Sequence, residues 1–149
     1  MQRQIGIIVL LLLALGLNMS GCGSTGPSPA SGSINGAWTA TLTNANGSVA
    51  YQFTATFTQG TGSDLSITNL TFTNPGSCGL SGESGAGGSF APASEAFGMS
   101  MVSPAIIGPS LNLQGTLSDG KISGTWSTSS GAQSCNGSGI FTIQPSTAG

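Results

Sequence analysis

The sequence predicts an all-β domain, a small antiparallel meander of about seven to eight strands. From Ile34 onward apolar and polar residues alternate with a period of two, and no stripe with the 3.6-residue period of a helix is present. Two turn dipeptides, Asn46-Gly47 and Asp119-Gly120, each separate a pair of alternating runs. The 149 residues allow one domain of ordinary size, and a charged content of only 4% argues against a classically disordered chain.

The first hairpin is predicted around Asn46-Gly47, because Asn-Gly is the strongest two-residue signal for a type I′ turn. With this pair as the loop, every apolar residue of the two flanking runs falls on one face, as a correct register requires. The expected cross-strand pairs are Trp38 with Ala55, Ala40 with Phe53, and Leu42 with Tyr51.

A second hairpin is predicted around Asp119-Gly120, between the runs Leu111–Ser118 and Lys121–Thr128. Pairing across it sets Leu117 opposite Ile122, Gly115 opposite Gly124, and Leu113 opposite Trp126. Glycine weakens a strand interior, so two facing glycines predict a sharp bend or a close backbone approach.

The remaining strands are expected at Leu65–Thr73, Glu95–Val102 and Gly139–Gln144, with a three-residue turn at Gly60-Thr61-Gly62 before the first of them. Leu70 is out of phase with Leu65, and a bulge near Asn69 would restore the alternation. The Gly- and Ser-rich stretch Ser81–Ser94 has no period and is expected to be a long surface loop.

A β-sandwich and a closed barrel both fit this number of strands. Open sheet edges are normally protected by Lys, Pro or inward-pointing charges, and these strands carry almost none. The closed barrel is therefore favoured over the sandwich, because closure removes the edges.

The N-terminal residues 1–21 have the features of an export signal. Arg3 provides a short positive region, and the apolar run Ile5–Leu17 is too short to span a bilayer core as a helix. The following Met19-Ser20-Gly21-Cys22 resembles the lipobox of bacterial lipoproteins, which implies a lipoprotein signal peptide at 1–21 and fatty acyl chains such as palmitate on Cys22.

Residues 22–33 are expected to be the lipidated cysteine and a flexible tether, because they contain no large apolar side chain. The folded domain is expected at 34–145. Gly23, directly after Cys22, resembles the class of lipoproteins that is directed to the outer membrane. The expected localisation is thus the cell envelope, lipid-anchored at the outer membrane, and the expected first partner is the membrane itself.

Cys78 and Cys135 remain once Cys22 is assigned to the lipid. In an oxidising compartment two cysteines have only one possible connectivity, so one disulfide between them is predicted. The alternative is two free buried thiols.

The composition argues against an enzyme and against a nucleic-acid binder. The chain has no His, which removes the usual base for a Ser or Cys nucleophile and the commonest metal ligand. We expect no cofactor and no metal site. Arg3 and Lys121 are the only cations, too few to neutralise a phosphate backbone. Among the carboxylates, only Glu95 could point inward beside apolar side chains and become a proton donor.

A set of large side chains on the inward faces is the candidate ligand-lining surface, and the competing interpretation is simple core packing. Its members are Trp38, Tyr51, Phe53, Met99, Met101 and Trp126. The two tripeptides Gly36-Ala37-Trp38 and Gly124-Thr125-Trp126 are similar to features of lipocalins and avidin-like barrels.

The chain as a whole resembles small β-rich envelope lipoproteins of bacteria, and Cys135-Asn136-Gly137-Ser138-Gly139 belongs to that resemblance. It implies a membrane-anchored, non-enzymatic binding or structural module whose partner is an envelope protein or a glycan. Two alternatives remain open at this point. One is a carrier of a small apolar ligand, and the other is a lipoprotein inhibitor of a hydrolase such as lysozyme.

Overall fold

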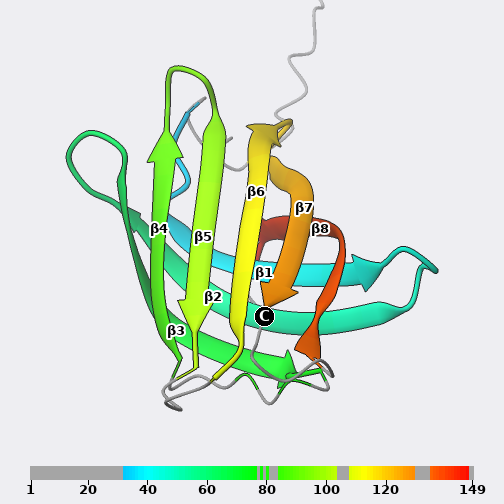
Figure 1. Cartoon of the computed structure of the whole chain (residues 1–149). Coiled ribbons are helices and arrows are strands. Elements are labelled where there is room, and N and C mark those ends of the chain that lie inside the picture. Colours follow the sequence, from blue (N-terminus) through cyan, green and yellow to red (C-terminus); the bar gives the residue numbers. More distant parts are fainter. Residues whose placement is uncertain are drawn as a thin grey trace, which may run out of the picture.

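The computed structural model describes residues 32–76, 78, 80, 84–103, 108–129 and 135–147. Within them eight antiparallel strands follow one another around a closed barrel, and β1 pairs with β8 to complete it (Figure 1). The all-β prediction and the preference for a barrel are confirmed. The strands are β1 (Gly36–Asn44), β2 (Val49–Gln59), β3 (Asp64–Asn74), β4 (Gly85–Ala91), β5 (Ala96–Val102), β6 (Ser110–Ser118), β7 (Lys121–Ser129) and β8 (Gly137–Pro145).

The up-and-down order divides the connections between two rims of the barrel. The N-terminal rim is where the chain enters β1, and it carries the β2–β3, β4–β5 and β6–β7 connections, the last two at the top of Figure 1. The chain also leaves β8 at this rim, where the Ser146 N–H donates to the Ala37 carbonyl at 2.9 Å. The opposite rim carries the β1–β2, β3–β4, β5–β6 and β7–β8 connections.

The barrel interior is filled by the apolar side chains that alternate along the strands, and it includes five phenylalanines and both tryptophans. Ile34, just before β1, is completely buried, and Leu80, between β3 and β4, is 1% exposed. Because these two residues lie at opposite rims, an apolar side chain enters the core from each end. The Trp38 Nε1–H donates to the Ile34 carbonyl at 2.7 Å and holds the first of them in place.

The turn of the first hairpin differs from the predicted type. A type I′ turn needs positive φ at both central residues, but only Gly47 has one, at +82°. The Gly47 N–H donates to the Asn44 carbonyl, and the Asn44 N–H donates to the Ser48 carbonyl, which makes a three-residue loop. The Asn46 Oδ1 accepts hydrogen bonds from both the backbone and the hydroxyl of Ser48, and this side-chain turn competes with the I′ geometry.

The predicted register of this hairpin is nevertheless confirmed, because a bulge compensates for the longer loop. Thr43 pairs with Val49, whereas the next residue, Leu42, pairs with Tyr51. Ala50 is therefore the extra residue on β2. From Leu42 onward the pairs are those expected from the sequence, and the apolar residues of both strands face the core.

The second hairpin has the predicted turn and register. Asp119 and Gly120 have φ values of +51° and +73°, as a type I′ turn requires, and Gly115 pairs with Gly124. A Cβ at Gly124 would overlap the Gln114 carbonyl oxygen, which confirms the close backbone approach. Phe141 pairs with Gly124 from β8, and its ring fills the space beside Gly115, where a Cβ would lie 2.8 Å from its Cζ atom.

The predicted bulge in the third strand is also confirmed. Asn69 has a φ of +51°, and the register between β2 and β3 shifts between the pairs Thr54–Thr71 and Thr56–Thr68. The bulge brings Leu70 and Phe72 back toward the core, where both are partly buried.

The predicted surface loop at Ser81–Ser94 is wrong, because β4 occupies Gly85–Ala91 within it. Glycines carry no side chain to show a period, so the alternation of this strand is invisible in the sequence. Its inward position Gly88 is small for a packing reason, since a Cβ there would lie 3.0 Å from the Ile67 Cδ1 atom. Phe90, one inward position further, is completely buried.

The predicted signal peptide at 1–21 and Cys22 lie outside the described residues, as does most of the tether at 22–33. The barrel from Gly36 to Pro145 falls within the domain expected at 34–145. Among the described residues, no helix has the length and apolar character needed to cross a bilayer.

The Gly115–Gly124 contact yields a stability prediction. Gly124→Ala should lower the free energy of unfolding by about 1–3 kcal/mol, because the added methyl group forces β6 and β7 apart. Urea denaturation measures the change. Gly87→Ala is the matched control in a strand interior, since a Cβ there meets nothing within 4 Å, and it should change stability by less than about 1 kcal/mol. Equal effects at both positions would contradict the close approach.

Candidate functional site

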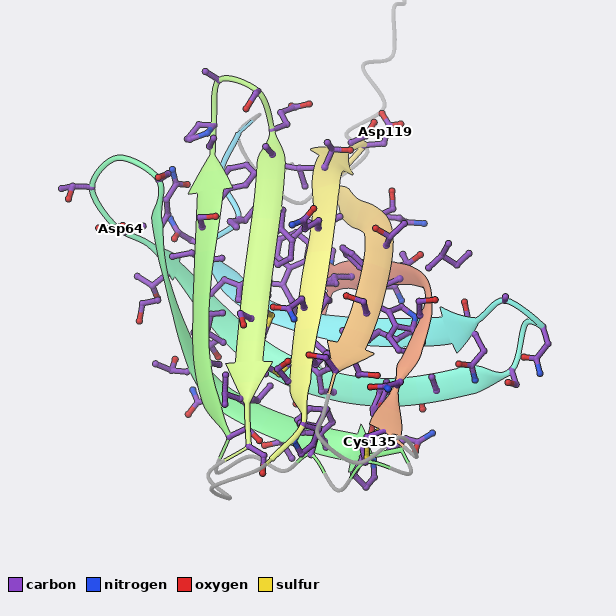
Figure 2. All side chains as sticks on the ribbon, viewed as in Figure 1. Asp64, Asp119 and Cys135 are labelled. Carbon is purple, nitrogen blue, oxygen red and sulfur yellow. The ribbon has the colours of Figure 1, made fainter. Side chains whose placement is uncertain are left out.

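The charged side chains of the described residues all lie at the N-terminal rim. Three are carboxylates and one is an ammonium group, and each sits in a connection or at the first residue of a strand there. They are Asp64, Glu95, Asp119 and Lys121. Figure 2 labels Asp64 and Asp119 on this side of the barrel and Cys135 at the opposite rim. The rim that carries Cys135 has no charged side chain among the described residues.

A cavity of about 270 Å³ opens at that opposite rim. Uncharged residues from the ends of β1, β2, β3, β7 and β8 and from the adjoining connections surround it. They are Asn44, Val49, Ala50, Tyr51, Asn74, Gly76, Cys78, Trp126, Thr128, Cys135, Asn136 and Gly137. Segments far apart in the sequence thus meet at one mouth of the barrel.

Trp126 forms part of the cavity wall and is held across the seam between β8 and β1. Its Nε1–H donates to the Thr43 carbonyl at 2.9 Å. A Cβ at Gly139 would overlap that same carbonyl oxygen, and a Cβ at Gly137 would lie 3.2 Å from the indole ring. The two glycines of the Cys135–Gly139 segment are therefore the surface on which the indole rests.

Tyr51 lies beside Trp126, with an edge-to-face contact between rings whose centroids are 5.4 Å apart. Gly76 has a φ of +64°, and a Cβ there would overlap the Tyr51 ring, so the residues after β3 fold directly onto this ring. Burial raises the pKa of the Tyr51 hydroxyl, and a side-chain hydrogen bond with Cys78 raises it further. The hydroxyl therefore stays protonated well beyond its ordinary range.

The predicted disulfide is absent from this site. Cys78 and Cys135 lie 2.9 Å apart and are not bonded, whereas a disulfide joins its sulfurs at about 2.05 Å. The Cys78 thiol donates instead to the Cys135 carbonyl at 3.3 Å. Both residues are half-buried and neither is in a disulfide, which corrects that part of the fold prediction. An even number of cysteines and an export signal give no information about this local geometry.

Two amide side chains at the cavity each have one group without a partner in the described part of the chain. The Asn44 Nδ2 donates to the Ser48 hydroxyl at 3.0 Å, which leaves its Oδ1 unpaired. The Asn74 Oδ1 accepts from the Gly76 N–H at 3.1 Å, which leaves its Nδ2 unpaired. The cavity thus offers one hydrogen-bond acceptor and one donor.

Thr128 also lines the cavity, and it bonds to the backbone that leads into β8. It is 7% exposed, and its hydroxyl donates to the Cys135 carbonyl, with the Gly137 carbonyl 3.4 Å away as a second acceptor. This hydroxyl fixes the chain where it turns into β8. Thr128, Asn44 and Asn74 were missed at the sequence level, since each ends an ordinary strand pattern.

The six residues predicted to line a ligand site are all buried, at 3% exposure or less. The cavity brings only two of them together, Tyr51 and Trp126. Trp38 lies toward the N-terminal rim and stacks on Phe57, and Phe53 contacts Phe72 in the core. Met101 is fully buried, while Met99 borders a shallow depression on the outer wall.

That depression belongs to a pair on the outer wall, of about 310 and 470 Å³, over β4, β5 and β6. Gly98 and Gln114 line both depressions, and Gly87, Gly88 and Ser100 line the smaller one. The Gly-rich strand β4 thus leaves a hollowed, uncharged surface on this side of the barrel.

Glu95, the candidate proton donor, lies in the turn before β5 rather than in the strand. It has a φ of +56° and an exposed side chain, so it does not point among the apolar residues. In the described ranges, no three His, Cys, Asp or Glu side chains gather closely enough to hold a metal ion.

Comparison of this chain with protein-family models, with curated proteins and with solved structures gives no match.

The environment of Tyr51 gives a prediction about alkaline pH. Its pKa is raised above the value of about 10 that the unfolded chain has, so the folded protein keeps a proton that the unfolded chain loses. This contribution to stability is fully present below about pH 10 and declines as the pH rises above it. Tyr51 is the only tyrosine of the chain, so the ultraviolet absorbance of the phenolate reports this group alone.

Denaturation measured at a series of alkaline pH values should show the decline in the native protein and a smaller decline in Tyr51→Phe. Phenolate formation in the folded protein at the ordinary tyrosine pKa would contradict the burial argument.

Proposed function

We propose that this chain is an envelope lipoprotein, anchored to the outer membrane through Cys22, that acts as a non-enzymatic binding module. One observation carries the proposal. The chain enters the barrel at the charged rim, while the cavity with its unpaired amide groups lies at the opposite rim. A barrel held by its N-terminus therefore presents the cavity away from its anchor.

The charges of the N-terminal rim require that the barrel stand off from the bilayer in this orientation. The N-terminal rim has three carboxylates and one ammonium group. Carboxylates repel anionic lipid headgroups over roughly one Debye length, about 8 Å at physiological ionic strength. The flexible tether that this proposal places at 22–33 would have a reach of roughly 20 Å. The tether is thus long enough for the barrel to stand off from the bilayer.

The filled interior favours binding at the barrel surface over carriage of an apolar ligand inside. Phe53, Phe57 and Phe90 are each buried to 1% exposure or less, and Ile34 and Leu80 enter the core from the two rims. Small barrels either fill the interior with such side chains or hold one ligand there. The partner, an envelope protein or a glycan, then contacts the opposite rim or the uncharged outer wall.

The anchor is tested by changing Cys22. In the native protein, mass spectrometry of material extracted from membranes should find Cys22 as the acylated N-terminal residue. Cys22→Ser should move the protein from the membrane fraction to the soluble fraction, because acyl chains supply the binding free energy of about 0.8 kcal/mol per buried CH₂. Cys78→Ser is the matched control and should stay in the membrane fraction. An unmodified native chain in the culture supernatant would refute the anchor.

Binding is tested by capture from envelope extracts on the purified full chain, followed by native mass spectrometry. Enrichment of a defined envelope protein or glycan supports the binding module. If no partner is enriched and a small apolar molecule copurifies instead, the carrier function replaces this proposal.

A further inference from the structure

We infer that the cavity at the opposite rim binds a single neutral sugar residue at the end of a glycan chain. This inference rests on the proposed binding function and names the class of ligand and its site. Asn44, Asn74, Tyr51 and Trp126 all line the cavity, and they determine the chemistry that it selects.

The size of the cavity limits the ligand to about one ring. Its volume of about 270 Å³ lies just below the range of roughly 300–1,000 Å³ that is typical of drug-sized ligands. At about 30 Å³ for each water, it holds on the order of nine water molecules. One pyranose ring with its hydroxyl groups fits this space, whereas a folded peptide or a second ring does not.

The polar groups match hydroxyls. A hydroxyl is both a donor and an acceptor. The Asn44 Oδ1 can accept from one hydroxyl of a sugar, and the Asn74 Nδ2 can donate to another. Neither group has a competing partner among the described residues, so a sugar would add hydrogen bonds without breaking any that the protein already makes.

The two aromatic side chains of the cavity suit the carbon face of a sugar ring. Trp126 and Tyr51 line the cavity, are each 3% exposed and hold one another in an edge-to-face contact, and Gly76 brings backbone directly against Tyr51. These surfaces are preorganised by the Trp126–Thr43 hydrogen bond. A sugar offers a C–H face to such a wall while its hydroxyls turn to the amides at the rim.

The described residues that line the cavity carry no charge, and this separates the ligand class from others. A sulfate, phosphate or carboxylate would lose its hydration without gaining a cation, since the single described ammonium group, on Lys121, lies at the N-terminal rim. A fatty acyl chain would leave the amide groups of Asn44 and Asn74 desolvated without partners. The cavity therefore favours a neutral, hydroxyl-bearing ligand.

The two tryptophans make the site directly observable. Trp126 borders the cavity, and Trp38 lies toward the other rim, so their indole N–H signals in a nuclear magnetic resonance spectrum report opposite ends of one molecule. We would titrate the full chain in detergent micelles with cellobiose, maltose, lactose, mannobiose and chitobiose. At least one of these neutral disaccharides should shift the Trp126 signal in a saturable manner and leave the Trp38 signal in place.

Two pairs of variants test the geometry. Val49→Trp places a large side chain at the cavity from a position that is 46% exposed, and it should abolish the saturable shift. Its control is Val102→Trp, a 52% exposed position at the same rim that does not line the cavity. Asn74→Asp keeps the acceptor used by Gly76 but removes the free donor. It should weaken binding by about tenfold or more, while Asn35→Asp, just before β1 at the N-terminal rim, adds the same charge away from the cavity and should leave affinity unchanged.

The inference is overturned if no disaccharide shifts Trp126, if the shift survives Val49→Trp, or if laurate or glucuronate binds the cavity more tightly than every neutral sugar. Membrane attachment through Cys22 and capture of a protein partner would persist in those outcomes. The failure of this inference is thus distinguishable from the failure of the proposed function.

Discussion

The pairing of β1 with β8 is the constraint on which the rest of the structure depends. It leaves no unpaired sheet edge between these strands in a chain that has almost no charges to protect one. The backbones of β1 and β8 approach closely at this seam. Gly139 faces Asn44 across it, and a Cβ at Gly139 would overlap the Thr43 carbonyl. The Trp126 indole crosses the same seam and bonds to that carbonyl. The placement of Trp126 therefore depends on the closure of the barrel.

Closure also creates the difference between the two rims. Because strands alternate in direction, the chain entrance and the β2–β3, β4–β5 and β6–β7 connections gather at one rim. The other four connections gather at the second rim. Each rim has a tryptophan whose indole N–H is satisfied by a backbone carbonyl, from Ile34 for Trp38 and from Thr43 for Trp126. Within the described ranges, the N-terminal rim has the charges and the opposite rim has the cavity. This polarity is the physical basis for assigning one rim to the anchor and the other to a ligand.

Local chemistry explains which elements could be predicted. Asp119-Gly120 defines a turn by itself, since both residues tolerate positive φ, and the out-of-phase Leu70 identifies the bulge at Asn69. The strand β4 was missed because its glycines leave no alternation to detect. The turn at Asn46-Gly47 was misassigned in type because the Asn46 side chain bonds to Ser48. A compensating bulge at Ala50 kept the register correct all the same.

By itself, the sequence determined which faces of the strands are buried, the register of both hairpins and the all-β class. Those properties follow from alternation and turn chemistry between residues close in the chain. The tertiary structure alone decided the closure of the barrel, the lack of a bond between Cys78 and Cys135, and the meeting of Asn44, Asn74 and Trp126 at one cavity. Each of these depends on contacts between strands distant in sequence, and no local pattern specifies where such strands meet.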